Sequence, residues 1–265
     1  MDLPALLTHQ IISIKELLNC DSIGFVSMNI FLTQGLSNKL RTLMGYLWVA
    51  WRDEQELNVY WEMDDACNGH FLDIFEPING LNFIYNENTA EMDFSGFSTF
   101  DEILHAYMNR NNVDVDIYEE HQRMYSKLRP LPRIREKANM FCEKNRISKC
   151  IGLHIRRTDH EGLAKAVESY SPDAEFIRFI QNNPDATGVF IATDNKATQD
   201  VFVSLYGDRV MFYSKIAQSE SLRKTSLEEA LIDILICSRC RAFQGSSYSS
   251  YSGLIETLRS LADDR

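Results

Sequence analysis

The chain has 265 residues, of which 45% are hydrophobic and 25% charged, the composition of a globular protein with a hydrophobic core. Its formal net charge of −11 at pH 7 argues against a broad nucleic-acid-binding surface, because such a surface needs basic side chains to neutralise phosphates. No apolar run approaches the roughly 20 residues of a membrane-spanning helix, and the segment from Met1 to Cys20 lacks the basic start and unbroken apolar centre of a signal peptide, so we expect a cytoplasmic protein.

Strand-like and helix-like segments alternate through the first half of the chain. An apolar run at 23–31 predicts a buried strand, and residues 39–52 carry an apolar stripe at helical spacing. Shorter runs at 57–61 and 81–85 predict two more strands. This alternation is typical of an α/β fold.

The turn between the first predicted strand and helix reads Gln34-Gly35-Leu36-Ser37-Asn38. A glycine at this point lets another group approach the backbone closely. The G-x-G-x-x-G pattern of a dinucleotide-binding loop is absent. A plain tight turn explains the same residues equally well.

Two prolines in the segment 129–132 interrupt helical stretches and suggest a domain boundary. We therefore expect two Rossmann-like βα domains, at 1–130 and 131–265, facing each other across a cleft. Ligands of open α/β sheets bind at the carboxyl ends of the strands, so polar residues at those ends are the candidates for function.

The alternation is clearer in the second half of the chain. The predicted strands are 150–155, 188–193, 210–213 and 242–244. The predicted helices are 173–181, 197–206, 226–240 and 252–262, with Ser226 as a candidate capping residue.

Two adjacent arginines, Arg156 and Arg157, directly follow a predicted buried strand, and His154 precedes them. Guanidinium groups bind phosphate oxygens bidentately and stay charged at any working pH. The alternative is a surface ion pair with Asp159 and Glu161, which would contribute little stability. Because the arginines leave the end of a strand, we favour an anion-binding role.

Two further segments have polar residues in unusual places. Asp233 stands among the aliphatic residues of a predicted helix, where a carboxylate needs a partner. A structural cap is the usual partner, and the two adjacent N–H donors of guanine would serve equally well. The serine-rich turn at 245–253 opens the last predicted helix, where backbone N–H groups form an anion site. A flexible loop is the alternative, which its place between a strand and an amphipathic helix disfavours.

Cys237 and Cys240 have the spacing of a redox or zinc motif. A structural zinc needs four ligands, and no second pair of cysteines or histidines lies at suitable spacing. Both cysteines also fall in an apolar helical segment, where residues three apart share one face. We therefore interpret them as reduced core thiols.

Taken in order, these elements resemble the fucosyltransferase superfamily of GT-B fold, which includes the core N-glycan and nodulation fucosyltransferases and, more distantly, the protein O-fucosyltransferases. The segment 151–159 looks like the most specific motif of that family. The resemblance implies that Arg156 contacts the diphosphate of GDP-fucose and that His154 lies by the guanine. It also implies that Asp194 belongs to the second strand-end motif and that Asp233 reads the guanine.

The resemblance extends from residue 34 to residue 253 and adds further donor-binding positions. Ser249 and Ser250 fall in the serine turn on the phosphate side, and Gly35 and Asn38 fall in the glycine-rich loop of the N-terminal half. Arg157, the second arginine of the pair, is expected to bind the donor as well.

The reaction implied is inverting transfer of fucose from GDP-fucose to a hydroxyl of a glycan or glycoconjugate, with no metal and no cofactor. Arg156 and the N-terminus of the last predicted helix, at Ser249, would stabilise the departing diphosphate. A carboxylate must take the proton of the acceptor hydroxyl, and Asp159 and Glu161 are the candidates, with Glu161 preferred. The family pattern loosens here, since it has a lysine where His160 stands and its catalytic acid a few residues after Glu161.

Three alternatives stay open at the level of sequence. A GT-B transferase could use another GDP- or UDP-sugar, for example a rhamnose donor. A catalytically inactive GT-B module could bind glycans or partners. A small phosphotransferase is disfavoured, because neither a P-loop nor a kinase motif is present. The sequence indicates neither the acceptor nor the oligomeric state.

Overall fold

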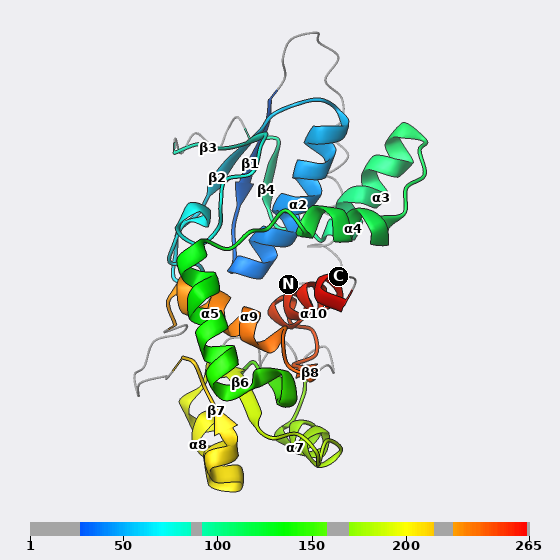
Figure 1. Ribbon diagram of the computed structural model, residues 1–265. Coiled ribbons are helices and arrows are strands. Elements are labelled where there is room, and N and C mark those ends of the chain that lie inside the picture. Colours follow the sequence, from blue (N-terminus) through cyan, green and yellow to red (C-terminus); the bar gives the residue numbers. More distant parts are fainter. Residues whose placement is uncertain (1–26, 86–91, 158–169, 215–224, 264–265) are drawn as a thin grey trace, which may run out of the picture. The chain divides into compact units, whose positions relative to one another are not determined.

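A computed structural model of the chain (Figure 1) describes residues 27–85, 92–157, 170–214 and 225–263. The described residues form two compact units, each built around its own parallel sheet. The first unit comprises 27–67 and 77–128, and the second comprises 68–76 and 129–263. The chain thus enters the second unit for a short stretch before it completes the first, which the sequence did not suggest.

The first unit contains a four-stranded sheet of order β3-β2-β1-β4 in which all neighbours are parallel. Its strands are β1 (Met28–Leu32), β2 (Leu57–Trp61), β3 (Leu81–Phe83) and β4 (Phe94–Gly96). Three of these overlap the predicted strands, and β4 was not predicted. A three-residue strand that ends in glycine offers too short a pattern to detect.

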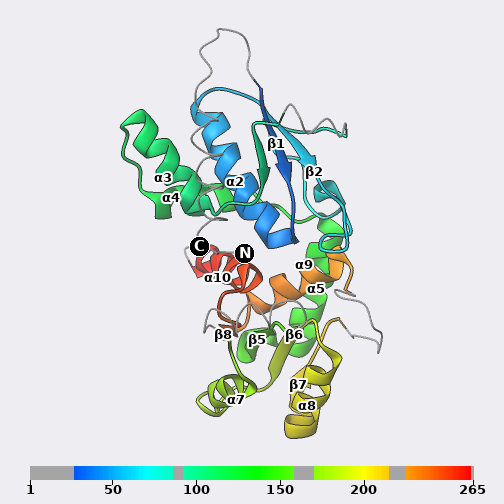
Figure 2. The same ribbon diagram turned by 180° about the vertical axis from the view of Figure 1, so that it is seen from behind.

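In its described part, the first unit has three helices: α2 (Leu36–Arg52), α3 (Phe100–Asn111) and α4 (Ile117–Tyr125). The helix α2 packs along the sheet (Figure 2) and buries Leu40, Leu43 and Leu47 completely. Gly45 allows α3 to pack closely on α2, because a Cβ at this position would lie 2.6 Å from Cδ1 of Ile103. The helix α2 is thus packed between the sheet on one side and α3 on the other.

The second unit contains a four-stranded parallel sheet of order β7-β6-β5-β8. Its strands are β5 (Ile151–Ile155), β6 (Val189–Thr193), β7 (Val210–Met211) and β8 (Ala242–Gly245). All four were predicted, although β7 is shorter than expected. In register, His154 is paired with Ala192 on one side and with Gly245 on the other, so the carboxyl ends of these three strands lie together.

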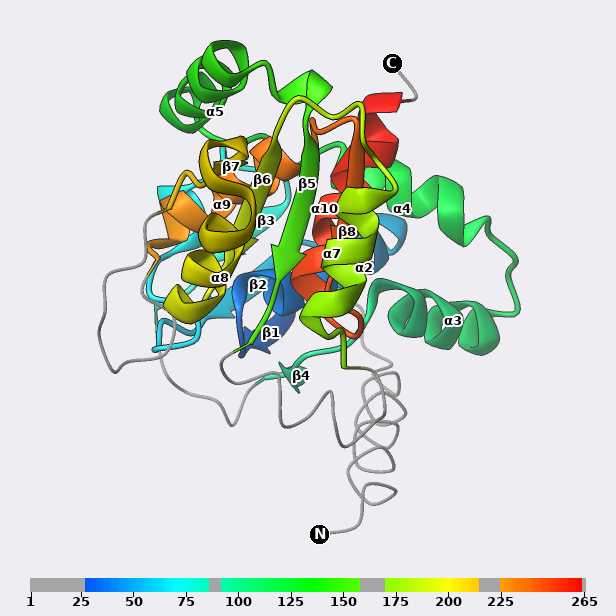
Figure 3. The ribbon, with the colours of Figure 1, turned by 90° about the horizontal axis from the view of Figure 1, so that it is seen from below.

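The helices of the second unit cover both faces of its sheet. They are α5 (Pro132–Asn145), α7 (Asp173–Gln181), α8 (Lys196–Tyr206), α9 (Leu227–Cys237) and α10 (Ser250–Asp263), with short 3₁₀ turns at Phe71–Asp73, Ile147–Lys149 and Gly207–Arg209. Figure 3 shows α7 and α8 on one face of the sheet and α9 and α10 on the other. In the described part of the chain, no helix is long and apolar enough to cross a bilayer.

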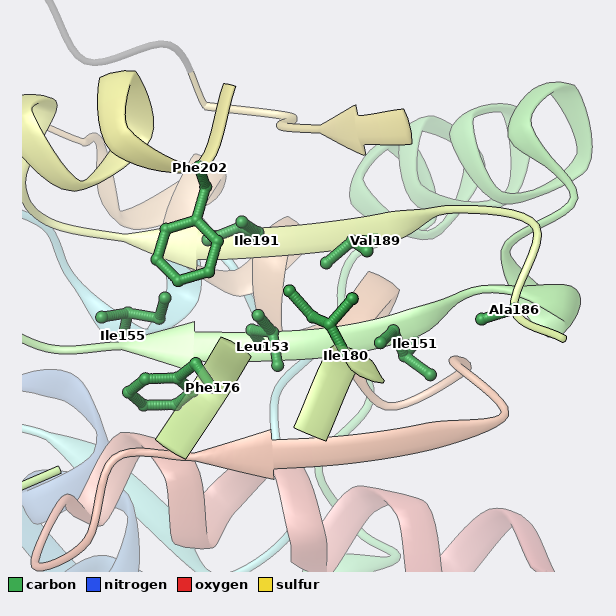
Figure 4. Close-up of a cluster of buried hydrophobic side chains, with 9 residues drawn as sticks. All are labelled: Ile151, Leu153, Ile155, Phe176, Ile180, Ala186, Val189, Ile191 and Phe202. Carbon is green, nitrogen blue, oxygen red and sulfur yellow. The ribbon is translucent and has the colours of Figure 1, made fainter. Parts of the chain in front are cut away.

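Side chains of β5 alternate between these two faces, as the period of a strand requires. Ile151, Leu153 and Ile155 enter a hydrophobic cluster with Phe176 of α7 and Phe202 of α8 (Figure 4). The residues between them face α9 and α10. A Cβ on Gly152 would lie 3.0 Å from Sγ of Cys240, and the ring of His154 contacts α10. Two consecutive side chains that follow the end of β5 should therefore point to opposite faces of the sheet.

Cys237 and Cys240 lie at the end of α9 and just beyond it as buried thiols that are not joined to each other. Burial raises the pKa of both thiols. The Sγ of Cys240 donates to the carbonyl of Ile236 at 3.6 Å, as expected for a cysteine that packs against its own helix. Their arrangement is that of core residues.

Candidate functional site

Strand order reverses between β5 and β8, because the chain moves from β5 outward to β6 and β7 and then returns to the other side of β5. Ligands of open α/β sheets bind outside the carboxyl ends of the strands at such a point. Here the segment 154–157 leaves β5 and the serine turn 246–249 leaves β8. Asp194 follows β6, the next strand along the sheet.

Arg156 is held at this edge by its side chain and by its backbone. Its Nε lies 3.2 Å from Oδ2 of Asp194, and 18% of its side chain is exposed. Its backbone N–H donates to Oγ of Ser246 at 2.9 Å. The same Ser246 hydroxyl donates to the carbonyl of His154 at 3.2 Å. Arg156 is therefore a partly accessible cation in a fixed place beside the serine turn.

Arg157 points in the opposite direction. Its guanidinium donates to the carbonyl of Ser171 at 2.9 Å and forms an ion pair of 2.5 Å with Asp173, at the start of α7. The ring of Tyr170 lies against it, with 5.1 Å between the guanidinium carbon and the ring centroid. Its guanidinium also donates to the backbone carbonyl of Arg156 at 3.2 Å, and its backbone N–H donates to Oδ1 of Asp194 at 2.9 Å.

His154 is fixed by the first turn of α10. Its Nδ1 lies 2.8 Å from Oγ of Ser252, and its ring stacks on Tyr251 with 4.4 Å between centroids. The Tyr251 hydroxyl donates to the carbonyl of Ala230 in α9 at 2.6 Å. Gly245 makes this packing possible, because a Cβ there would lie 2.4 Å from Oγ of Ser252.

The serines of the turn after β8 divide into two groups. Ser246 and Ser247 use their side chains inside the protein: Ser246 bonds to the end of β5, and Ser247 bonds to Ser171. Ser249 and Ser250 stand at the start of α10, where backbone N–H groups are oriented toward an approaching anion. Between the two groups, Tyr248 adopts the left-handed conformation with φ of 58°.

Asp233 lies on α9 with 4% of its surface exposed, and its Oδ1 has no hydrogen-bond partner within the described ranges. Burial raises the pKa of this carboxyl to about 7, the charge of Glu229 adds to the effect, and a polar contact with Ser214 opposes it in part. Burial, followed by the charge of Asp233, also raises the pKa of Tyr251, and Arg156 opposes that shift. Asp233 and Arg156 thus lie near the same ring.

No family model matches the chain, and no curated protein sequence matches it. Solved structures do match it. The NodZ α-1,6-fucosyltransferase in a crystal soaked with GDP-fucose has a TM-score of 0.56 and 17% identity over 88% of this chain and 93% of that one. NodZ from Bradyrhizobium gives 0.52 and 16% over 87% and 93%, and POFUT1 in complex with GDP-fucose gives 0.55 and 10% over 91% and 96%. The chain has the GT-B fold.

The predicted α/β class and the resemblance to GT-B fucosyltransferases are therefore confirmed at the level of fold. The second GT-B unit brings His154, Arg156 and Asp194 together at the strand order reversal, next to the turn that leads to Ser249 and Ser250. Asp233 lies behind Tyr251 on the adjoining helix. Which of these residues bind a ligand stays a prediction.

In the first GT-B unit, Gly35 and Asn38 lie at the start of α2. Gly35 precedes the helix with φ of −71°, which any residue can adopt, and Gln34 takes the left-handed conformation with φ of 77°. The Oδ1 of Asn38 is buried and has no hydrogen-bond partner in the described part of the chain. An unsatisfied amide oxygen beside a helix N-terminus is compatible with a ligand at this position.

The two candidate bases, Asp159 and Glu161, lie outside the described residues. Within the described ranges, no group of three or more histidine, cysteine, aspartate or glutamate side chains could hold a metal ion. Sequence reasoning missed Ser171, and it singled out the turn 245–253 without giving Tyr251 or Ser252 a role of its own. The serine turn offered a signal for Ser252, and no local pattern distinguishes Ser171.

Proposed function

We propose that this chain is an inverting, metal-independent glycosyltransferase that transfers fucose from GDP-fucose to a hydroxyl of a glycan or glycoconjugate. The observation that carries the proposal is Asp233, a buried carboxyl near the ring of Tyr251 whose Oδ1 has no hydrogen-bond partner among the residues that the structure describes. The proposal is supported by the fold, since similar structures include NodZ soaked with GDP-fucose and POFUT1 in complex with GDP-fucose.

Asp233 would read the base of the nucleotide. The Watson–Crick edge of guanine carries two adjacent N–H donors, and a carboxylate can accept from both. A buried carboxylate oxygen without a hydrogen bond is costly, so such a base would satisfy the Oδ1 of Asp233, which finds no partner among the described residues. Adenine and uracil offer no matching pair of donors. His154, held by Ser252 and Tyr251, would lie along the same base.

Arg156 would bind the diphosphate together with the N-terminus of α10 at Ser249 and Ser250. The leaving diphosphate gains negative charge in the transition state, and preorganised donors stabilise it without reorganisation. Asp194 orients the guanidinium through Nε. Gly35 and Asn38 of the first unit are donor-binding residues of this proposal on the strength of the family resemblance alone, and residues of the domain at 1–130 would bind the acceptor.

The proton of the attacking hydroxyl would pass to Glu161 or Asp159. An acceptor hydroxyl is a poor nucleophile until a general base removes its proton, so an inverting transferase needs one carboxylate near the anomeric carbon. Glu161→Gln and Asp159→Asn would identify it, because the catalytic base should lose turnover while the affinity for GDP is kept.

Thermal unfolding in the presence of GDP and a chelator tests the donor site. A ligand at about 100 times its Kd stabilises a protein by about 2.7 kcal/mol. For a chain of this size we expect a rise in Tm of about 5 °C or more. Arg156→Ala should abolish the rise, and Arg178→Ala, a control on the exposed side of α7, should keep it. Normal GDP binding by Arg156→Ala would contradict the proposal.

Release of free nucleotide from a panel of sugar donors tests the reaction. GDP-fucose should be turned over, and GDP-mannose, UDP-sugars and a rhamnose donor should not. Turnover of one of the other donors instead would support a glycosyltransferase but would contradict the assignment of GDP-fucose as its donor. Binding of GDP without turnover of any donor would instead indicate a GT-B binding module and would exclude an enzyme.

A further inference from the structure

The two adjacent arginines have different environments because β5 alternates between two faces. Arg156 continues the face of His154, toward α9 and α10, and pairs with Asp194. Arg157 continues the face of Leu153, toward α7, where its side chain is only 8% exposed and its guanidinium contacts Ser171, Asp173 and the ring of Tyr170. A guanidinium in this position is unsuited to direct contact with a diphosphate on the Arg156 side.

Arg157 is nevertheless linked to the serine turn through one residue. Its guanidinium binds the carbonyl of Ser171 at 2.9 Å. The hydroxyl of Ser171 accepts from the backbone N–H of Ser247 at 3.0 Å and lies 3.1 Å from the Ser247 hydroxyl. Ser171 is buried and stands 76 positions before Ser247, so these bonds join the start of α7 to the turn between β8 and α10.

We propose that Arg157 and Ser171 are positioning residues: they hold the turn 246–249 in the geometry that binds the diphosphate, without contact to the donor. This inference rests on the proposed function, because it concerns the same donor site. The turn needs such support. It contains Tyr248 in the left-handed conformation, which a tyrosine adopts only where surrounding contacts enforce it. Ser246 fixes one end of the turn to β5, and Ser171 fixes the next residue.

The proposal predicts a selective defect. If the turn loses its anchor, the donors at the start of α10 move relative to Arg156, and only the phosphate part of the ligand is affected. The base is held elsewhere, by Asp233 and His154. Affinity for GDP should therefore fall while affinity for guanosine, which has no phosphate, should stay the same.

The experiment compares three single variants of the full chain and the double variant of Ser171→Ala and Arg157→Lys. Ser171→Ala removes both bonds to the turn and keeps the carbonyl that Arg157 binds. Arg157→Lys keeps the charge but cannot reproduce the fork that joins Ser171 to Asp173. Ser260→Ala is the matched control, since it removes a serine hydroxyl of the same unit that donates within α10, to the carbonyl of Thr257 at 2.8 Å. Calorimetry measures GDP, and ligand-observed NMR measures guanosine.

We expect Ser171→Ala and Arg157→Lys each to weaken GDP binding about ten-fold or more, because displacement of a binding group by about 1 Å has effects of this size. Guanosine affinity should stay within about two-fold of the wild type. The double variant should bind GDP no more weakly than the single variant with the larger defect, because both substitutions break the same link. Ser260→Ala should bind both ligands normally.

Other outcomes separate the two hypotheses. Equal loss of GDP and guanosine in Ser171→Ala would assign a general structural role and overturn the inference. Normal GDP binding by Ser171→Ala with a defect in Arg157→Lys would overturn it too, because Arg157 would then act directly. If one of the two variants does not fold, the other decides by the same comparison of its loss of GDP affinity with its loss of guanosine affinity. A wild type that binds neither ligand would refute the proposed function, and the inference with it.

Discussion

Asp233 is in a state that is unfavourable for the protein alone. The carboxyl is almost completely buried, and its pKa is raised to about 7 because burial disfavours the charged form. Between pH 4 and pH 7 the unfolded chain releases this proton and the folded chain keeps it. Stability from this group is therefore greatest in acid, falls as the pH rises, and is lowest above pH 7.

Asp233→Asn should accordingly stabilise the protein in the absence of nucleotide. At pH 8 we expect the free energy of unfolding to rise by on the order of 4 kcal/mol, because the amide carries no charge to bury. At pH 4 the two proteins should be equal. Urea unfolding at both pH values measures the difference. Equal stability at pH 8 would mean that the carboxylate already has a good partner there.

The same variant should lose the nucleotide, and the wild type should bind it in a pH-dependent way. GDP-fucose is a suitable probe, because each of its phosphates has one ester bond and one anhydride bond and so keeps a single negative charge between pH 6 and pH 8. As Asp233 becomes protonated its capacity to accept from guanine falls, so affinity should decrease from pH 8 to pH 6, by at most about ten-fold per pH unit below the pKa. Calorimetry should find a flat, weak profile for Asp233→Asn. A profile that is unchanged by the substitution would assign the titration to another group.

At the scale of elements, the close contact between β8 and α10 positions the site. Gly245 ends β8 and allows the first turn of α10 to pack against it, which brings Ser252 to His154. Neither element was expected to depend on this glycine, since the serine turn drew attention to the residues after it. The contact follows from the fold: β8 pairs with β5 in the sheet, and α10 covers the sheet face on which the His154 ring lies.

Gly245→Ala should disturb this contact. Its Cβ would lie 2.4 Å from both Cβ and Oγ of Ser252, and overpacking of this kind costs about 1–3 kcal/mol. Affinity for GDP should fall as well, because α10 is displaced. The matched control is Gly253→Ala, where nothing lies within 4 Å of the added Cβ. Since Gly253 is inside α10, alanine should stabilise by up to about 1 kcal/mol. Thermal unfolding compares the two, and equal effects would contradict the proposed contact.

At the scale of the whole molecule, the sequence predicted those helices and strands that a local pattern of apolar residues marks. The helix at 173–181 and the strands of the second unit were predicted because their apolar periodicity is strong and turn residues bound them. Arg156 was predicted as a cation at the end of β5 because it directly follows this strongly apolar strand. The link from Ser171 to Ser247 could not be predicted, because 76 residues separate them and no pattern near Ser171 distinguishes it.

The stretch 68–76 was also beyond prediction, because only tertiary packing assigns it to the second unit. Phe71 is completely buried there and contacts Phe75 at 5.0 Å between ring centroids. A Cβ on Gly69 would lie 3.0 Å from Leu227 of α9, and the carbonyl of Asp73 accepts from Arg133 of α5 at 2.6 Å. The segment is thus part of the structure that supports α5 and α9.

Phe71→Ala tests this assignment, because it should weaken the second unit although its neighbours in sequence belong to the first. Truncation of a buried phenylalanine costs about 3–5 kcal/mol. Hydrogen exchange should find lost protection in α5, α9 and β5, with β1 and α2 little changed. Phe94→Ala is the matched control: Phe94 is a buried residue of β4 that packs on Tyr46, and its truncation should give the reverse pattern. If Phe71→Ala instead deprotects β1 and α2 first, the segment belongs with the first unit and the division of the chain must be redrawn.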